Sequence, residues 1–420
     1  MAGKISGARF VHTSNWDIEL YQSLISPVPV HNLSLLGIQI SWNPSKLKVL
    51  DEDLLNHFCH VASGSLATFG QDAVSLGKIL VRIALEGETA SGAAALQALL
   101  AFSSLHRYGL QSQALELKIA ALEKLKEGSF SLSLSAKEAI QHIAAGMLLC
   151  SFEVHQSSCT SGQWTQYVDG AKAVIAASSV QTLLESDSDV AVLLDWAYYH
   201  DVLARFSLLH WNKEGNQKLT LIPPDFFSSK VSNLQPPILS ILNLLSQVCD
   251  VVSSSSIQLG KRGKLHEFKS FLEVLDWRIR SLPIPNITDD DDDPTLVIKL
   301  YQLAILVYLN RISEGLIDQP IRMQQQIDQA FAILPRLRFC KQQFPIFVIG
   351  CESREDEQRA NVLDLISRTE QMSSSRCFNH CRGLLQAVWA QDDLAESNNV
   401  SYRGKLTSVI SNCVILPTFV

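Results

Sequence analysis

Apolar side chains recur at helical spacing along almost the whole chain from Asp51 onward, whereas the alternation typical of strands is nearly absent. This pattern predicts an all-α fold. Besides a helix that begins after Ser135, the predicted helices cover residues 114–128, 162–178, 188–212, 235–253, 264–281, 295–315, 319–335, 353–372, 376–393 and 402–413. Two short segments, 219–222 and 346–349, are the strand candidates. Residues 1–50 are mixed and contain three prolines, so we expect a partly irregular N-terminal arm over 1–50 and one large domain over 51–420.

Local signals indicate several helix ends and faces. Ser135 and Glu138 have the spacing of a capping box, in which each side chain accepts from the other residue's backbone amide. The helix over 114–128 carries Leu115, Ile119 and Leu122 on one side as its apolar face. Because no period of 20–50 residues repeats, the helices are expected to form an irregular, α-solenoid-like stack of antiparallel hairpins.

Composition narrows the class of protein. Of 420 residues, 47% are hydrophobic and 18% are charged, which is enough apolar material for a large core. The net charge of −7 gives the whole chain no attraction for nucleic acid or for an anionic membrane. The small basic cluster of Lys261, Arg262 and Lys264 is too limited to change this prediction.

Nine scattered cysteines favour buried, reduced thiols over a disulfide framework. The N-terminal residues have no apolar run typical of a signal peptide, and the longest apolar stretch, at 300–309, is about half of what spans a bilayer. We therefore expect an intracellular protein that does not enter a membrane.

Residues 196–211, WAYYHDVLARFSLLHW, concentrate polar groups among large aromatics and raise the question of a catalytic or metal site. Asp201 and Arg205 are spaced as an intrahelical ion pair, and they point away from the side of the helix that carries its large apolar residues. His200 and His210 lie roughly 80° apart around a helix, so they do not easily share a metal. The large apolar residues recur at helical spacing and form one stripe, which indicates a core helix. They are Val192, Trp196, Tyr199, Leu203 and Phe206.

Five aspartates at 289–293 contain the spacing D-D-x-x-D, which binds Mg²⁺-diphosphate on helices of terpene synthases. Pro294 follows directly and suits the first turn of a helix. The acids are therefore expected to precede that helix and to complement its dipole.

Cys377, His380 and Cys381 could present three ligands on one helix face. A structural zinc site normally needs four ligands, usually from two separated pairs, and no C-x₂-C pair occurs in the sequence. The usual local signals for hydrolase, dinucleotide and P-loop sites are also absent. We predict no catalytic, cofactor-binding, metal or DNA-binding residue in this chain, and no cofactor.

Five passages, in order and in register over about residues 50–415, resemble the regulatory region of fungal zinc-cluster (Zn₂Cys₆) transcription factors, in the branch of the second fungal-specific transcription factor domain. They are ALLAFSSLHRYG with ALELKIAALEKLKEG, AIQHIAAGMLLCSFEV with WTQYVDGAKAVI, WAYYHDVLARFSLLHW, LYQLAILVYLNR, and FPIFVIGCESREDEQRANVLDLISRTEQ with LLQAVWAQDD. Tyr167 stands where the branch usually has His, so no role is transferred to it.

The resemblance implies a regulator of transcription in a fungal nucleus that binds protein partners, either the transcription machinery or a second copy. It also allows a small-molecule effector that binds between the helices. The zinc-cluster head needs six closely spaced cysteines, and the first cysteine here is Cys59. DNA contact is therefore expected only through a head or partner outside this chain. Two alternatives stay open: a helical-hairpin interaction scaffold unrelated to DNA, and an all-α Mg²⁺-dependent enzyme using residues 289–293.

Overall fold

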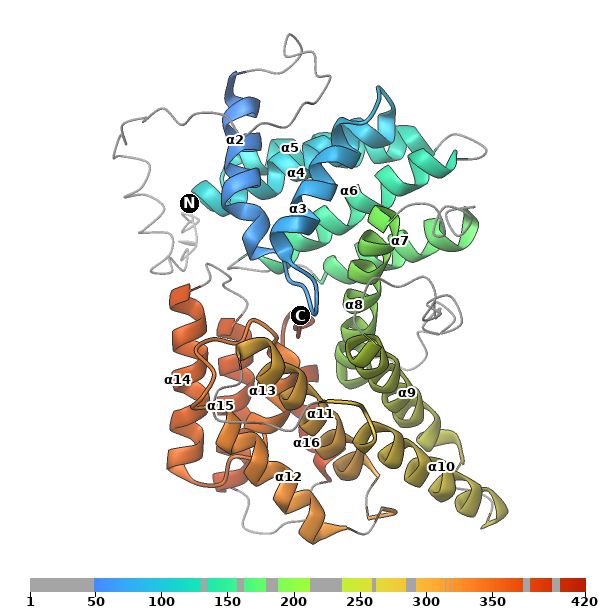
Figure 1. The fold of residues 1–420 in the computed structure, drawn as a ribbon, viewed down its shortest axis with the longest axis vertical. Helices are drawn as coiled ribbons and strands as arrows, with labels where there is room; N and C mark the ends of the chain where they lie inside the picture. The colour runs from blue at the N-terminus through green and yellow to red at the C-terminus, as the bar shows by residue number, and fades with distance from the viewer. Residues whose placement is uncertain are drawn as a thin grey trace, which may run out of the picture. The chain divides into compact units, whose positions relative to one another are not determined.

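Every regular element in the described part of the chain is a helix, which confirms the all-α prediction (Figure 1). The computed structural model describes residues 49–129, 134–156, 162–178, 188–211, 236–258, 262–284, 292–313, 315–317, 319–372, 378–394 and 401–420. The first half contains α2 (Val49–His60), the 3₁₀ helix η2 (Ala62–Ser65), α3 (Ala73–Leu85), α4 (Ala90–Tyr108), α5 (Ser112–Ser129), α6 (Ala136–Val154), α7 (Trp164–Ala177) and α8 (Ser188–Trp211). The second half contains α9 (Pro236–Gln258), α10 (Arg262–Arg280), α11 (Asp293–Ile312), α12 (Pro320–Ile333), α13 (Gln343–Gly350), α14 (Asp356–Met372), α15 (Phe378–Leu394) and α16 (Tyr402–Ser411).

Capping residues set several helix ends where the sequence predicted them. At the start of α6, Ser135 Oγ accepts from the Glu138 amide at 3.3 Å, and Glu138 Oε2 accepts from the Ser135 amide at 3.0 Å. The Ser135 hydroxyl also donates to Glu138 Oε2 at 2.7 Å, and this bond, together with the one from the Ser135 amide, holds the pKa of the Glu138 carboxyl below its ordinary value. At the start of α11, the Asp292 side chain accepts from the Thr295 amide at 3.2 Å, and Pro294 occupies the first turn. Both ends need only residues within one turn of each other, so the local sequence determines them.

Helices that follow one another along the chain pack side by side. In the first half, α4 lies against α3, α5 and α6, and the contacts then run from α6 to α7 and from α7 to α8. In the second half, α9, α10 and α11 pack together, α12 and α13 lie on α11, and α15 joins α13, α14 and α16. The row does not stay open, because α16 returns to contact α8 and α11.

Residues 416–420 tie the two halves of the body together. Phe419 O accepts from the Phe344 amide on α13 at 3.1 Å, while Leu416 O accepts from Trp164 Nε1 on α7 at 3.2 Å. All five residues are buried. Residues 416–420, which follow the last helix, are therefore part of the core.

The central helix α8 is buried on every side and not along a single stripe. Its residues from Leu193 to Ser207 are all buried, including the predicted apolar residues Trp196, Tyr199, Leu203 and Phe206. Helix α11 is the one described helix that is long and apolar enough to cross a membrane, but 72% of its apolar stretch is buried inside the body. Both helices are thus core helices surrounded by other helices.

The strand prediction for residues 346–349 was wrong, because they belong to α13. A short, fully apolar run has no period by which a strand can be distinguished from a buried helix, and all eight residues of α13 are buried. The other strand candidate, 219–222, lies outside the described residues.

The predicted apolar face of α5 does not face the core. Leu115, Ile119 and Leu122 are exposed, whereas Ala114 and Ala121 are buried. The neighbouring helix α4 is rich in buried alanine and serine, so α5 turns its small side chains toward α4 and approaches it closely. Leu115, Ile119 and Leu122 are left on the outside, while Leu117 and Leu125 are partly buried against the core.

Phe206 occupies the centre of an aromatic cluster, with edge-to-face ring contacts at centroid distances of 5.0 Å to Phe344, 5.0 Å to Phe419 and 5.2 Å to Tyr308. We expect Phe206→Ala to lower the free energy of unfolding by about 3–5 kcal/mol, because the cavity would lie among helices from both halves. Urea denaturation of the full chain followed by circular dichroism measures this. Ile321→Ala, at a side chain that is 77% exposed, is the control and should change stability by less than about 0.5 kcal/mol. A loss below about 1 kcal/mol in Phe206→Ala would contradict the central role of this ring.

Candidate functional site

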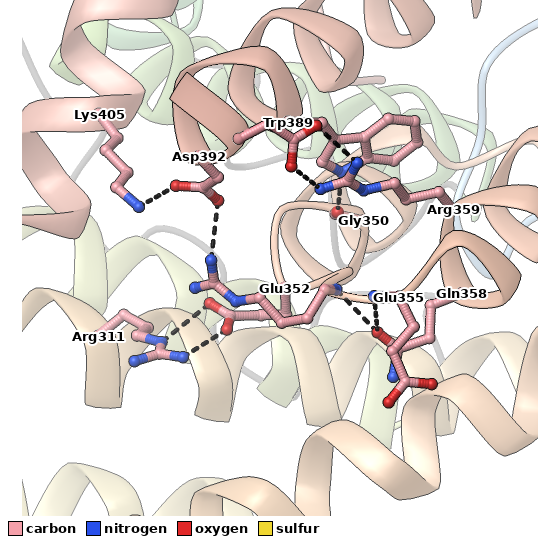
Figure 2. A network of polar contacts seen from close by, with 11 residues as sticks. Arg311, Gly350, Glu352, Glu355, Gln358, Arg359, Trp389, Asp392 and Lys405 are labelled. Atoms are coloured by element: carbon pink, nitrogen blue, oxygen red, sulfur yellow. Dashed lines mark hydrogen bonds and ion pairs between the residues drawn. The ribbon is translucent and has the colours of Figure 1, made fainter. Parts of the chain in front are cut away.

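The carboxylates of Glu352 and Asp392, whose side chains are 2% and 8% exposed, lie at the centre of an ion-pair network that joins α11, α15 and α16 to the turn between α13 and α14 (Figure 2). Arg311 of α11 binds Glu352 through both arms of its guanidinium, with Nε–Oε1 at 2.9 Å and Nη2–Oε2 at 2.5 Å. Asp392 of α15 accepts from Arg354 Nη1 at 3.0 Å and from Lys405 Nζ of α16. The network therefore connects α11 to the turn after α13, and that turn to α15 and α16.

Arg359 at the start of α14 extends this network toward Asp393. Its two terminal nitrogens donate to the Asp393 carboxylate at 2.8 and 2.7 Å, and its guanidinium carbon lies 5.6 Å from the centroid of the Trp389 ring. Trp389 Nε1 in turn donates to Gly350 O at 2.8 Å. The hydrogen bonds from Arg359 hold the pKa of the Asp393 carboxyl below its ordinary value.

Arg359 binds this distant carboxylate and not Glu355, which lies four residues before it in the sequence. The spacing of four residues on one helix allows that pair, but α15 brings Asp393 close enough for a bidentate contact and Trp389 close enough for a cation–π contact. A long-range partner with better geometry thus replaces the local one.

The two histidines of α8 have separate partners. His210 Nε2 lies 2.8 Å from the Tyr308 hydroxyl, and its Nδ1 lies 3.3 Å from Thr407 Oγ1. His200 Nδ1 lies 3.0 Å from Trp196 O. Burial lowers the pKa of His200 to about 4 and that of His210 to about 3. At neutral pH both rings are therefore uncharged parts of the core.

Asp201 and Arg205 form the predicted ion pair, at 3.0 Å, but the pair lies in the core and not on a helix surface. Lys172 of α7 reaches the second oxygen of Asp201 at 2.9 Å. Arg205 Nη1 donates to Ser246 Oγ of α9 at 2.6 Å. Because the partners come from both neighbouring helices, this charged cluster fixes how α7 and α9 sit on α8.

The acidic run contributes structural contacts where it is described. Asp292 caps α11, as predicted, and Asp293 binds Arg338 Nε at 3.1 Å. The aspartates at 289–291 lie outside the described residues, as does Cys377. The other two residues of the candidate ligand set, His380 and Cys381, lie on α15. Burial lowers the pKa of His380, and Cys381 is fully buried.

The buried thiols are held in their unreactive form. Burial raises the pKa of Cys249 and of Cys340 to about 12, and it raises the pKa of Cys351 and Cys381 as well. Since the thiolate is the nucleophile and the metal ligand, these side chains pack as small apolar groups. Within the described ranges, no group of three or more His, Cys, Asp or Glu side chains is arranged to hold a metal ion.

Sequence reasoning did not identify Glu352 and Asp392 as network centres. Glu352 directly follows a run of apolar residues, which is a signal for a buried charge in need of a partner. Its partner Arg311 is 41 positions away, so no local spacing identifies the pair.

Comparison with known proteins identifies a family and a curated relative. The family model described as "Fungal specific transcription factor domain" matches residues 53–407. A curated relative, "Transcription factor iacI" from Pestalotiopsis fici (strain W106-1 / CGMCC3.15140), is 65% identical over 388 residues, which are 92% of this chain and 100% of the relative. No solved structure matches the chain.

Glu352→Gln should lower the free energy of unfolding by about 2 kcal/mol, because the variant keeps the shape of the side chain and leaves Arg311 without its counter-charge. Chemical denaturation measures the loss. Glu127→Gln, which breaks an exposed pair with Lys124, is the matched control and should cost less than about 0.5 kcal/mol. In a double-mutant cycle, adding Arg311→Gln should cost less than the sum of the single changes. Strict additivity would mean that the two side chains do not interact.

His210 should make the body sensitive to acid. Its pKa of about 3 in the folded chain lies below the ordinary value near 6.5, so as pH falls below about 6.5 the unfolded chain binds a proton that the folded chain does not. Stability therefore falls toward low pH, by about 1.4 kcal/mol per pH unit for one such group. Denaturation at pH 7, 6 and 5 should show a shallower slope for His210→Gln than for the native chain. His60→Gln, at an exposed histidine, is the control, and equal slopes for the native chain and His210→Gln would refute the prediction.

Proposed function

The chain belongs to the fungal specific transcription factor domain family and is a fungal transcription regulator, and on this premise we propose that its helical body acts in the nucleus by binding proteins. The observation that carries the proposal is the extent of the likeness. The family match spans residues 53–407 and so covers the described helices from α2 to α16 almost completely, and the 65% identity extends over the full length of the relative. The domain proposed over 51–420 would act as one regulatory body, preceded by the arm over 1–50.

The chemistry of the interior supports a binding role over a catalytic one. His210 is hydrogen-bonded to Tyr308, Glu352 is bound by Arg311, and Asp201 is held by Lys172 and Arg205. These contacts are the ones that hold helices together, and they leave the side chains engaged with one another. We therefore expect no catalysis, and we assign the regulatory contacts to the surface of the body.

We infer that DNA is reached through a head or partner outside this chain. The net charge of −7 opposes binding to a polyanion, because such binding depends on releasing counterions from phosphates with Lys and Arg. Protein partners of the transcription machinery would then link this body to a promoter.

A tethered reporter tests the regulatory role. The full chain, fused to an unrelated DNA-binding domain in a fungal host, should change expression of a reporter with matching sites at least about threefold, and a fluorescent fusion of the chain should concentrate in the nucleus. The DNA-binding domain alone is the control, and the untethered chain should leave the reporter unchanged. A reporter that does not respond, together with a cytoplasmic fusion, would favour the interaction scaffold unrelated to DNA.

Purified chain 1–420 should not retard a promoter fragment in an electrophoretic mobility assay at physiological salt, since its net charge repels the duplex. The same assay with the fused DNA-binding domain is the positive control. A discrete shift by the chain alone, competed by unlabelled promoter DNA, would overturn the inference that DNA contact lies elsewhere.

A further inference from the structure

Helix α10 has apolar side chains on two faces. One face, with Leu272, Leu275 and Ile279, is buried where α10 packs against α9 and α11. On the other face Phe271 is 46% exposed, Val274 is 53% exposed and Trp277 is 61% exposed. Figure 1 shows α10 on the outer side of the α9–α11 group, with part of the helix extending beyond its neighbours. An aromatic pair and a valine on one exposed helix face are typical of an interface for another helix.

The exposed face has the spacing of a coiled-coil seam. Glu267, Phe271, Val274 and Arg278 are separated by four, three and four residues, as successive core positions of a heptad are. At 100° per residue these four side chains fall within an arc of about 60°. Glu267 and Arg278 are both exposed, at opposite ends of the seam.

The residues of this seam match those of a second α10 helix that runs in the opposite direction. In an antiparallel pair centred between positions 272 and 273, Phe271 faces the partner's Val274, and Glu267 faces the partner's Arg278. A parallel pair would instead place glutamate against glutamate and arginine against arginine.

We propose that α10 pairs with α10 of a second copy of this chain in an antiparallel, two-fold symmetric arrangement. The charge pattern selects this occupant, because each end of the seam supplies the counter-charge that the other end needs. Arg278 is exposed, and its Nη1 also donates to Gln247 Oε1 of α9 at 2.8 Å. The interface uses the same surface on both subunits and therefore closes at two copies.

One helix from each subunit forms a small contact, so the dimer is weak and depends on concentration, with a dissociation constant on the order of 10 μM. The pairing does not depend on the transcriptional role of the chain. Sedimentation equilibrium of the full chain between about 1 and 100 μM should show a monomer–dimer transition. A chain that stays monomeric over this range would overturn the proposal.

Val274→Glu should abolish the transition, because it places two like charges side by side in the apolar centre of the seam. Ile119→Glu on α5 is the matched control, since Ile119 is 55% exposed on a different helix. It should dimerise as the native chain does, and circular dichroism should show the native helix content for both variants. A dimer that persists in Val274→Glu, or that is lost equally in Ile119→Glu, would contradict the assignment to α10.

Charge reversal tests the antiparallel register. Glu267→Arg and Arg278→Glu should each weaken the homodimer roughly tenfold, because each makes both end contacts repulsive. The double variant should recover native affinity, and a mixture of the two single variants should form heterodimers with attractive contacts at both ends. If the single variants weaken the dimer and neither the double variant nor the mixture recovers it, the antiparallel pairing is wrong and α10 binds a different helix.

Discussion

The body depends on the complete burial of α8. A helix buried on one face leaves its polar side chains in water, but residues 193–207 of α8 are enclosed on every side. A charged group on that helix must then find a partner in the protein, because an unpaired charge in a core costs several kcal/mol. Asp201 and Arg205 meet this requirement with Lys172 and Ser246, which come from the helices on either side. The positions of α7 and α9 are therefore fixed by charge as well as by shape.

The same requirement explains why α16 returns to α8. His210 lies near the end of α8, and burial makes its charged form unfavourable, so the ring is neutral and hydrogen-bonded at both nitrogens. One partner is Tyr308 on α11 and the other is Thr407 on α16. Lys405, two residues from Thr407, carries the contact on to Asp392. Polar contacts thus join α16 to α8 on one side and to α15 on the other, and together with the buried Leu406, Val409 and Ile410 they close the row of helices.

The parts of the structure that could be predicted are those set within one or two helical turns. The capping box at Ser135, the cap at Asp292 and the i,i+4 pair of Asp201 and Arg205 all involve residues close together in the sequence, and all three are present. The parts that could not be predicted depend on which helix arrives from far away. Arg359 bonds to Asp393, not Glu355, because α15 reaches it, and α5 exposes Leu115 because α4 accepts only small side chains at close range. Periodicity shows that a helix has an apolar side, but it does not show which neighbour will cover that side.

The exposed faces of α5 and α10 have different physical meanings, although both carry large apolar side chains. The face of α5 results from close packing elsewhere on the same helix: turning Ala114 and Ala121 inward moves Ile119 outward. No comparable reason applies to α10, whose buried face already contains Leu272, Leu275 and Ile279. Its second apolar face is not needed for folding. Glu267 lies at one end of this face and Arg278 at the other, so each would meet its opposite charge on an antiparallel second copy. In a regulator whose buried carboxylates Asp201 and Glu352 are paired inside the body, a surface of this kind is where a contact with another chain can form without disturbing the core.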